Sequence, residues 1–494
     1  MRLSQLIADL PTARSTGDTG VDVTGITSDS RAVRPGHLFV ALRGQQFDGH
    51  AFIPAAVQQG AAAIVCEAAP NPPVAVPVVV TGNAHEALGH LASAFHGHPS
   101  RRLKLIGVTG TDGKTTTTTL TAATLRRAGA RTAHLTTVEA CDGLTTRPNE
   151  AGFTTPQAMD IQAFLAQAVA QRCVYAVLEV SSHALATGRV AGCEFDVAVF
   201  TNLAPEHLDY HRTMEDYRAE KEKLFRMLSG PRTKGGVPTG VVNLDDPAAA
   251  HFLALSPLAL TFGFSPEAQV RAEQVRYTAK GTNFFLHLPT TEITVATRLL
   301  GRFNVENWMA AAAAALAAGG SPRLVVDAAA TTAAPPGRME RLPADAPFEV
   351  FVDFAHTPHG LAAALETLRS ITTGRVIAVF GHAGRRDPTH RHDLVAAAKG
   401  RCDSMIFTMD DPYDEDPAAI LSQMRRAAMA IGLTEFRDFR CIIDRRDAFA
   451  AAFALAKPGD AVLLAGRGHE TYIPLNGKRL PFHDPTVALE VLRG

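Results

Sequence analysis

The residues best suited to chemistry stand together in one short loop. The run Gly110-Thr111-Asp112-Gly113-Lys114-Thr115-Thr116 follows an apolar strand pattern and opens a helical one. In such a loop, glycines let successive backbone N–H groups point at one anion, and the helix N-terminus adds partial positive charge. Lys114 then neutralises the outer phosphates of a nucleoside triphosphate, and the Thr115 hydroxyl binds Mg²⁺. We therefore predict a phosphate-binding loop, although Val108 stands where the commonest pattern has glycine.

Further metal ligands follow two other strand patterns. Glu179 ends one apolar run, and Glu206 and His207 come shortly after another. The carboxyl ends of parallel strands meet at one edge of a sheet, where the sites of α/β proteins lie. Because Mg²⁺ prefers hard oxygen ligands, we predict a magnesium site formed by Thr115, Glu179 and, less obviously, His207. Taken one at a time, these features also have ordinary structural explanations: a glycine-rich turn, a glutamate at the end of a strand and a histidine in a loop.

The elements that must position these groups alternate between strand and helix patterns. Such alternation predicts parallel sheets covered by helices on both faces. Strands are expected at residues 103–109, 175–180, 196–200 and 240–244, and later at 348–354, 375–380, 404–408 and 461–464.

Two breaks divide the chain into three predicted α/β domains. Residues 1–98 form the first, residues 99–334 a central phosphate-loop ATPase-like domain with a parallel sheet, and residues 335–494 a Rossmann-like domain. The first break is the punctuated run His96-Gly97-His98-Pro99-Ser100, and the second is Pro335-Pro336-Gly337.

Composition excludes several classes of function. Lysine and arginine number 48 and aspartate and glutamate 49, so the net charge is −1. This balance disfavours generic binding to nucleic acid or to a membrane surface, and no apolar run reaches the ~20 residues that span a bilayer. Six cysteines lie far apart without a CxxC pair, and Asp9 stands too early for a signal peptide. We predict a cytoplasmic enzyme, monomeric by default.

Four motifs, in this order along the chain, resemble those of the Mur ligases, ATP-dependent enzymes that form amide bonds in peptidoglycan precursor synthesis. After the phosphate loop come Asn202…His207…His211, then Gly301-Arg302-Phe303-Asn304-Val305-Glu306-Asn307, then Asp353-Phe354-Ala355-His356-Thr357-Pro358. The N-terminal run Ser28-Asp29-Ser30-Arg31 is similar to that of the members that add a diamino acid to UDP-N-acetylmuramoyl-L-alanyl-D-glutamate. The resemblance covers essentially the whole chain.

This resemblance implies a reaction and its residues. ATP converts the D-Glu carboxylate to an acyl phosphate, which the incoming amine attacks, with Lys114, Lys221 and His207 as catalytic residues. Lys221 matches a family lysine that is carbamylated to hold a second Mg²⁺; an ordinary solvated helix lysine is the alternative. The resemblance also assigns ATP contacts to Asn304, Asn307, Arg338 and Asp353. One or both asparagines, which share a helix face, contact the adenine, and Asp353 the ribose.

The resemblance also places the substrates. The first domain binds the UDP-sugar, the second ATP and the third the amino acid. Hydroxyl, amide, aromatic and guanidinium groups that suit pyrophosphate and carboxylate are expected at Ser28, Ser30, Gln45, Gln46, Phe47, Thr154, Thr155, Ser182 and Arg189.

The amino acid is predicted from the run Asp410-Asp411-Pro412-Tyr413. Family members that use meso-diaminopimelate typically show Asp-Asn-Pro-Arg there. Losing a cation and gaining an anion disfavours a distal carboxylate and favours a distal ammonium, hence L-lysine or L-ornithine. Arg386 matches the residue that holds the α-carboxylate, and Gly466 and Glu470 lie in a second matching stretch where Glu470 can bind an amino group. Arg385 is an extra cation that keeps meso-diaminopimelate as the alternative.

Two other functions were weighed. A folate-type polyglutamate ligase is disfavoured by the N-terminal segment of roughly 95 residues, because such enzymes generally lack a UDP-binding domain. A phosphate-loop ATPase that acts only as a switch would leave Lys221, Asp353 and Arg386 without a purpose.

Overall fold

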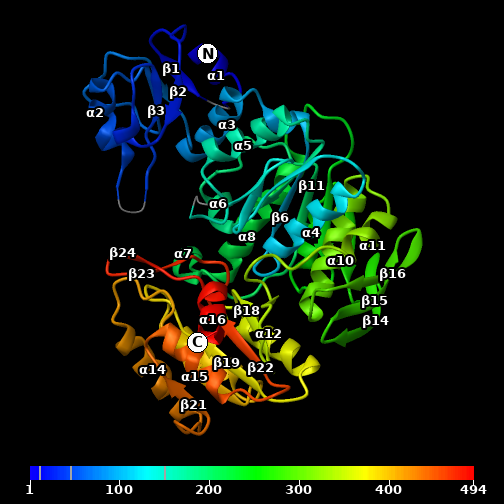
Figure 1. The fold of residues 1–494 in the computed structure, drawn as a ribbon. Coiled ribbons are helices and arrows are strands. Elements are labelled where there is room, and N and C mark those ends of the chain that lie inside the picture. The colour runs from blue at the N-terminus through cyan, green and yellow to red at the C-terminus, as the bar shows by residue number, and fades with distance from the viewer. Residues whose placement is uncertain (11–12, 45–46, 150–151, 494) are drawn as a thin grey trace.

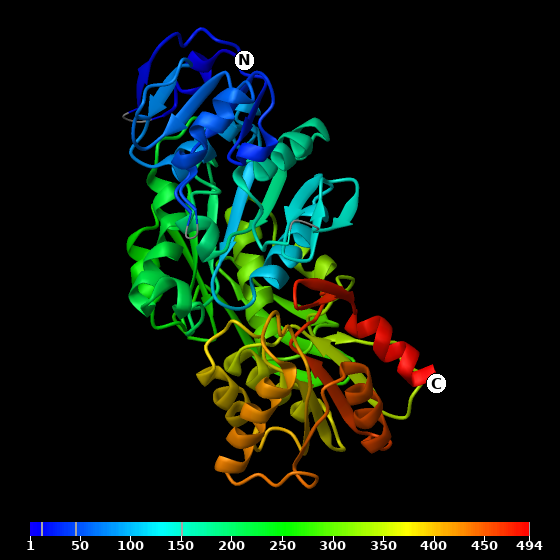
Figure 2. The same ribbon diagram turned by 90° about the vertical axis from the view of Figure 1, so that its left-hand side faces the viewer.

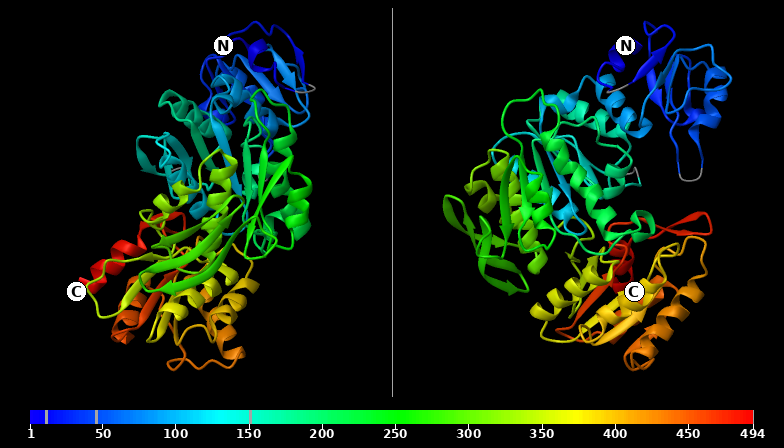
Figure 3. Two further views of the ribbon diagram at one scale, coloured as in Figure 1. Left: turned by 90° about the vertical axis from the view of Figure 1, so that its right-hand side faces the viewer. Right: turned by 180° about the vertical axis from the view of Figure 1, so that it is seen from behind.

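The computed structural model describes residues 1–494 apart from 11–12, 45–46, 150–151 and 494. The chain forms three lobes in a row, each built on its own β-sheet (Figure 1). We call them the N-terminal lobe (sheet of β1–β5), the central lobe (β6–β16) and the C-terminal lobe (β17–β22). The N-terminal and C-terminal lobes lie at opposite ends of the molecule (Figures 2 and 3). Among the described residues, no helix has both the length and the apolar character needed to cross a membrane.

The N-terminal lobe has a five-stranded sheet in the order β1-β5-β4-β3-β2. The pairs among β2 to β5 are parallel, and β1 is antiparallel to β5. Helix α3 buries its leucines against one face, as its amphipathic pattern requires. The elements are α1 (Leu3–Leu6), β1 (Arg14–Thr16), β2 (Gly25–Thr27), β3 (His37–Val40), α2 (Ile53–Gln58), β4 (Ala63–Cys66), β5 (Val78–Val80) and α3 (Ala84–Phe95).

The central lobe has an eleven-stranded sheet in the order β16-β15-β14-β13-β12-β11-β6-β10-β7-β8-β9. Its strands are β6 (Lys104–Thr109), β7 (Thr132–Leu135), β8 (Glu139–Cys141), β9 (Thr146–Pro148), β10 (Tyr175–Glu179), β11 (Val197–Phe200), β12 (Thr239–Asn243), β13 (Leu258–Gly263), β14 (Val270–Thr278), β15 (Gly281–Leu288) and β16 (Thr291–Thr297). Its helices are α4 (Lys114–Arg126), α5 (Ala158–Ala170), α6 (Ser182–Ala186), α7 (Leu208–His211), α8 (Met214–Arg226), α9 (Ala249–Ala254), α10 (Arg302–Ala317) and α11 (Arg323–Ala329).

The predicted parallel sheet is the middle of this mixed sheet. Strands β6, β7, β10, β11, β12 and β13 pair in parallel. Strand β14 also joins β13 in parallel, and antiparallel pairs then extend both edges, β14–β15–β16 on one side and β7–β8–β9 on the other. The sequence analysis did not predict these edges. In β15, buried residues alternate with more exposed ones, which is the pattern of a strand with one face toward solvent.

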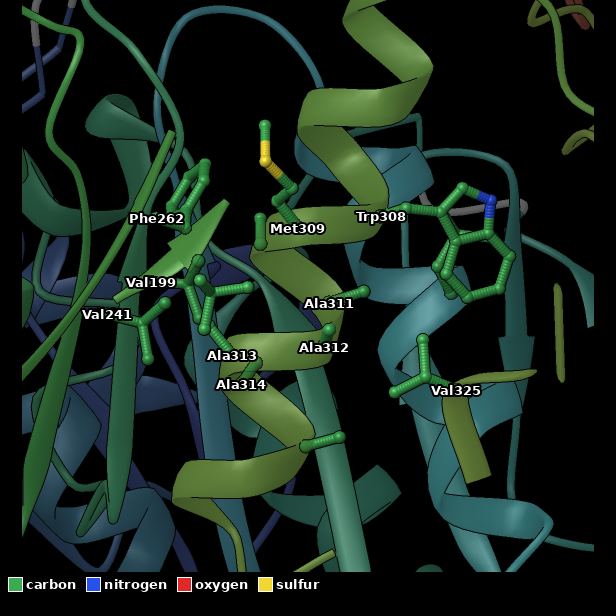
Figure 4. Packing of buried hydrophobic residues seen from close by; sticks show 14 of the residues in the cluster. Val199, Val241, Phe262, Trp308, Met309, Ala311, Ala312, Ala313, Ala314 and Val325 are labelled. Carbon is green, nitrogen blue, oxygen red and sulfur yellow. The ribbon is translucent and has the colours of Figure 1, made fainter. Parts of the chain in front are cut away.

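Helix α10 fills the space between the central sheet and α4 (Figure 4). Its residues from Ala310 to Ala315 are all buried, and these small side chains let the helix pack closely on its neighbours. On the other side Trp308 points toward α4 and donates its Nε1–H to Thr297 Oγ1 at 3.0 Å. This packing fixes the first two turns of α10, which carry Asn304 and Asn307, beside the start of α4.

The C-terminal lobe has a six-stranded sheet in the order β17-β18-β22-β19-β20-β21. It is parallel except for β17, and its four predicted strands are confirmed to within one residue at each end. The elements are β17 (Glu340–Arg341), β18 (Glu349–Asp353), α12 (Pro358–Ile371), β19 (Val376–Phe380), α13 (Thr389–Ala398), β20 (Ser404–Phe407), α14 (Pro417–Ala430), β21 (Phe439–Cys441), α15 (Arg445–Leu455), β22 (Ala461–Ala465), the hairpin β23 (Tyr472–Leu475) and β24 (Lys478–Pro481), and α16 (Asp484–Arg493).

A buried ion pair braces the ends of two strands in this lobe. Arg445 and Asp484, at the starts of α15 and α16, are both completely buried. The guanidinium donates Nε–H to Asp484 Oδ1 at 2.9 Å and further N–H groups to the carbonyls of Met409 and Ala465. Because Met409 and Ala465 precede Asp410 and Gly466, this pair fixes two loops that carry predicted site residues.

We expect Asp484→Asn to lower the free energy of unfolding of the C-terminal lobe by about 3–5 kcal/mol, because it leaves the Arg445 charge buried without its carboxylate. Urea unfolding followed by circular dichroism measures the change. The matched control is Glu490→Gln, which breaks the half-exposed Arg446–Glu490 pair and should cost no more than about 1 kcal/mol. If the two substitutions lowered the free energy of unfolding equally, the Arg445–Asp484 pair would not stabilise the lobe as proposed.

Candidate functional site

The phosphate loop joins β6 to α4 and packs against the end of β11. Gly110 has φ 149°, and a Cβ there would lie 1.9 Å from Thr201 Oγ1. Gly113 has φ 81°, and a Cβ there would lie 2.3 Å from Asn307 Oδ1. Both positions therefore require glycine. Asn202 holds the loop by accepting Thr111 N–H at its carbonyl and Asp112 N–H at Oδ1.

The predicted loop lysine and its neighbouring threonine lie where the chemistry needs them. Lys114 Nζ donates to the carbonyls of Gly110 at 3.0 Å and Thr111 at 2.7 Å. Thr115 Oγ1 lies 3.1 and 3.0 Å from the two carboxylate oxygens of Glu179. Glu179 also accepts the N–H of Thr137 at 2.8 Å, a contact that the sequence did not indicate. A hydroxyl and a carboxylate at this distance form an oxygen donor set that fits Mg²⁺.

These residues line a cavity of about 200 Å³, which we call the loop cavity. It brings together most of the residues predicted for phosphate, metal and catalysis. Its lining includes Thr111, Asp112, Gly113, Lys114, Thr115, Thr116, Thr154, Glu179, Ser182, His207, Lys221, Arg338 and Arg386. Within the described part of the chain, no group of three or more His, Cys, Asp and Glu side chains is arranged for a metal ion. The metal prediction therefore depends on the mixed set of Thr115, Glu179, His207 and Lys221.

Lys221 is a buried lysine on α8, a helix capped by the Thr213 hydroxyl. Its Nζ donates to Gly110 O at 2.6 Å and lies 4.1 Å from the centre of the Tyr217 ring. Burial, with help from the Lys114 charge, lowers the pKa of Lys221 well below its usual value, which favours the neutral amine. Lys223 is more exposed and pairs with Glu220 at 2.7 Å. The two lysines of α8 therefore lie in different environments, Lys221 in the loop cavity and Lys223 near the surface.

His207 lies between the loop cavity and the C-terminal lobe. Burial lowers the pKa of His207 to about 4, so its imidazole is neutral at pH 7. Its Nε2 lies 3.4 Å from Glu206 Oε1. The same Glu206 oxygen lies 3.4 Å from Nε2 of His356, which belongs to the C-terminal lobe. Although burial opposes it, the hydrogen bond with Glu206 raises the pKa of His356.

A second cavity of about 110 Å³, the interlobe cavity, lies between α10, the phosphate loop and the C-terminal lobe. Asn307 lines it and accepts the Thr117 hydroxyl at 3.2 Å. Asn304 does not line it: its Nδ2 donates to Leu300 O, and its Oδ1 accepts from Asn307. Of the two predicted amides, only Asn307 borders this cavity. Asn304 holds the Asn307 side chain in place through their hydrogen bond.

The C-terminal lobe adds Arg338 and Asp353 to the interlobe cavity. Asp353 accepts the N–H groups of Met339 and Ala355, and burial raises the pKa of its carboxyl to about 6. Arg338 Nη2 donates to Thr115 Oγ1 at 3.3 Å, and its guanidinium lies 4.6 Å from the centre of the Phe354 ring. As predicted, Arg338 reaches the phosphate loop from the other lobe.

A histidine missed by the sequence analysis also joins the two lobes. His359 Nδ1 lies 3.1 Å from Asp112 Oδ2, and this hydrogen bond raises the pKa of His359. The signal was present, because His356 and His359 directly follow the strand that ends at Asp353. Their acidic partners lie more than a hundred residues away, so the sequence did not show the pairing.

The N-terminal groove, a depression of about 910 Å³ between the N-terminal and central lobes, contains part of the predicted substrate set. Ser28, Ser30, Phe47 and Arg189 line it. Gln45 and Gln46 fall outside the described residues.

Three other predicted substrate residues lie elsewhere. Thr154 and Ser182 line the loop cavity instead of the groove. Thr155 is buried beneath the site and donates its hydroxyl to the carbonyl of Glu179 at 2.9 Å. Arg189 Nη1 donates to Thr155 O at 2.7 Å, which links the groove to the strand that carries Glu179.

A fourth cavity of about 160 Å³, the C-terminal cavity, contains the residues predicted to bind the amino acid. Its lining includes Glu206, His207, His356, Arg386, Asp410, Asp411, Tyr413, Gly466 and Glu470. Arg385 is not among them: its Nε lies 2.5 Å from Asp414 Oδ1 on the exposed side of the loop. Burial raises the pKa of Glu470 to about 7.

The structure corrects one part of the charge argument for this cavity. The prediction counted Asp411 as an added, uncompensated anion. Asp411 instead pairs with the fully buried guanidinium of Arg467. The other carboxylates of the lining are those of Asp387, Asp410, Glu470 and Glu206, of which Glu206 pairs with His207 and His356.

The loop cavity and the C-terminal cavity share a wall. Glu206, His207, His356 and Arg386 line both. A group activated beside the phosphate loop and a nucleophile held in the C-terminal lobe can therefore meet at this wall. Such an arrangement suits phosphoryl transfer followed by attack of a second substrate.

Comparisons with known proteins agree with this arrangement. Models of the Mur ligase family catalytic domain, the Mur ligase middle domain and the Mur ligase glutamate ligase domain match residues 22–96, 108–315 and 337–468. The chain is 42% identical to a UDP-N-acetylmuramyl-tripeptide synthetase of Roseiflexus sp. (strain RS-1), covering 100% of this chain and 99% of the relative. It is 41% identical to a UDP-N-acetylmuramoyl-L-alanyl-D-glutamate–2,6-diaminopimelate ligase of Bacillus velezensis, covering 94% of each.

A solved structure of a UDP-N-acetylmuramoyl-L-alanyl-D-glutamate–2,6-diaminopimelate ligase is also similar. It superimposes with a TM-score of 0.70 at 30% identity, over 100% of this chain and 99% of that one. The similarity therefore extends over all three lobes. From the matched domains, the full-length relatives and the phosphate-loop site, we conclude that the chain belongs to the Mur ligase family of ATP-dependent ligases.

Proposed function

We propose that the chain joins a diamino acid to the D-Glu carboxylate of UDP-N-acetylmuramoyl-L-alanyl-D-glutamate, with L-lysine or L-ornithine favoured. The observation that carries the proposal is the shared wall of the loop and C-terminal cavities, where an activated carboxylate and an amine can meet. Relatives named for the same nucleotide substrate support it. The N-terminal groove favours this substrate over a folate, because its serines and Arg189 are donors suited to a pyrophosphate.

The reaction takes place in two steps. A D-Glu carboxylate oxygen attacks the γ-phosphorus of ATP, so that an acyl phosphate forms and ADP leaves. The amine then attacks the acyl carbon, inorganic phosphate leaves and the amine loses a proton. Backbone N–H groups of the loop and Lys114 hold the phosphates, and Arg338 adds a cation from the C-terminal lobe. Catalysis is thus mainly positioning and electrostatic stabilisation.

The metal sites are part of the proposal. Thr115 and Glu179 are placed to hold one Mg²⁺, and His207 and a carbamylated Lys221 a second, and these ions supply neutralisation of phosphate charge. Carbamylation needs a neutral amine: the Lys221 nitrogen bonds to the carbon of CO₂ and a proton leaves. The depressed pKa of Lys221 supports this step, because burial keeps the amine neutral.

The preference for a distal ammonium is supported by the charges of the C-terminal cavity. Among the described residues that line it, Arg386 is the only arginine or lysine, and it suits the α-carboxylate. Asp410 and Glu470 offer carboxylates to an ammonium. Tyr413 stands at the wall, and Arg385 is turned toward Asp414. Because several relatives are named for 2,6-diaminopimelate, meso-diaminopimelate is the competing substrate to test.

Four features of the protein stay predictions. They are the domain limits of 1–98, 99–334 and 335–494, the monomeric state, the absence of nucleic-acid and membrane partners, and the cytoplasmic location.

Phosphate release from ATP tests the function. With UDP-N-acetylmuramoyl-L-alanyl-D-glutamate present, we expect L-lysine or L-ornithine to support a kcat/KM at least about tenfold above that of meso-diaminopimelate, a difference of about 1.4 kcal/mol. Stimulation by meso-diaminopimelate alone would keep the ligase and reject the amino-acid preference. A chain that hydrolyses ATP without consuming any amine would be a switch and would overturn the ligase proposal.

Two lysines on α8 test the carbamate. Lys221→Ala should lower ligation by more than about 100-fold, beyond the usual cost of losing an outer-shell partner of a metal ligand. Lys223→Ala, two residues away on the exposed side, should stay within about twofold of the unaltered enzyme. The rates of amide formation are compared at saturating substrates. Similar losses in both variants, or full activity in Lys221→Ala, would reject the assignment.

The raised pKa of Glu470 predicts a pH effect on amine binding. Below about pH 7 the carboxyl is protonated and neutral, so it no longer attracts a distal ammonium. We expect the KM for L-lysine to rise as the pH falls below about 7, in excess of any rise in Glu470→Gln. The Glu470→Gln variant should have a raised KM for L-lysine at about pH 8, and its KM should change less with pH. Parallel profiles for the two proteins would show that Glu470 does not bind the ammonium.

A further inference from the structure

The two loops that line the C-terminal cavity share one buried cation, Arg467. Its side chain is completely buried, directly behind Gly466. Nη1 pairs with Asp411 Oδ1, and Nη2 donates to the Tyr472 carbonyl at 2.5 Å. Nε has no hydrogen-bond partner among the described residues. A guanidinium in this position is stable only if nearby anions compensate its charge.

Three carboxylates form ion pairs with this cation, and that of Asp411 is much the closest. Asp411 makes the close pair, whereas Glu470 Oε2 lies 3.4 Å and Asp410 Oδ1 4.0 Å from Nη1. Gly466 makes room for Asp410, because a Cβ at that position would lie 2.3 Å from Asp410 Oδ2. Three carboxyl groups around Arg467 give this part of the wall an excess of negative charge when they are ionised, while Arg386 is a second cation on the lining.

The geometry of this charge cluster is held from outside the cavity. Tyr413 donates its N–H to Pro474 O at 2.9 Å and accepts the Asn476 N–H at 2.5 Å, so the hairpin β23–β24 fixes the loop of Asp410 and Asp411. Arg445 donates to the carbonyls of Met409 and Ala465 from below. The charges therefore keep fixed positions, and a change in one of them changes the field in the cavity.

We propose that Arg467 is a positioning residue that sets the side-chain preference of the C-terminal cavity, because Asp411 cancels its charge. While the pair is intact, the wall attracts a distal ammonium through Asp410 and Glu470. If Asp411 loses its charge, only Glu470 and Asp410 remain to offset Arg467, so the wall becomes less negative and repels a distal carboxylate less. The inference rests on the proposed function. It adds Arg467 to the residues that determine which amino acid the C-terminal cavity prefers.

The test compares kcat/KM for meso-diaminopimelate with kcat/KM for L-lysine, with ATP and UDP-N-acetylmuramoyl-L-alanyl-D-glutamate. Asp411→Asn should raise this ratio by about tenfold or more, as expected for one unit charge acting over several ångströms in a partly buried site. Arg467→Gln should lower it, since Asp411 is then an uncancelled anion. The double variant Asp411→Asn/Arg467→Gln removes both charges and should return the ratio to within about threefold of the original.

The matched control is Asp393→Asn, which removes an exposed acid on α13 of the same lobe that pairs with His392. It should leave the ratio unchanged. Thermal unfolding of each variant identifies any that fails to fold; the opposite shifts of the two single variants keep the proposal testable if one of them is lost. An Asp411→Asn ratio within twofold of the original, or a double variant altered as much as the single, would overturn the proposal.

The two proposals fail differently in this experiment. The absolute preference of the unaltered enzyme tests the proposed function. The change of the ratio between variants tests the Arg467–Asp411 pair, whichever amine the unaltered enzyme prefers.

Discussion

The site depends on the parallel pairing of β6 with β10 and β11. In this register Glu179 lies opposite Val108, and Phe200 lies opposite Thr109. All three strands therefore end at one edge, where the phosphate loop, the Glu179 carboxylate and Asn202 come together. A slip of one residue would turn the Glu179 carboxylate to the opposite face of the sheet. The buried apolar strands hold this register, so the core also determines the chemistry.

The second requirement is that the site is shared between lobes. Arg338, His356 and His359 of the C-terminal lobe contact Thr115, Glu206 and Asp112 of the central lobe. Each contact joins a cationic or titratable side chain to an oxygen at the phosphate loop or beside it. The loop cavity, the interlobe cavity and the C-terminal cavity therefore have walls that belong to two lobes. In the proposed reaction, such shared walls would exclude water from an acyl phosphate.

Features encoded by neighbouring residues were predictable from the sequence. The phosphate loop and the strand that ends at Glu179 follow from local patterns, whereas Lys221 was singled out only by the family resemblance. The pairing of Asp411 with Arg467 was not predictable, because 56 residues separate them and only the folded loops bring them together. Likewise, helix periodicity places Asn304 and Asn307 on one face, but only their depth in the packed helix decides which of them borders the interlobe cavity.

The Arg445–Asp484 pair also affects the order in which parts of the protein reach their final structure during synthesis. Asp484 begins the final helix, yet it holds the arginine that fixes the ends of two much earlier segments. On the ribosome, the N-terminal and central lobes emerge and can fold first. The strands around the C-terminal cavity are also made before α16, but they lack the carboxylate that fixes Arg445. The wall of the C-terminal cavity therefore reaches its final structure last during synthesis, after the phosphate loop has formed.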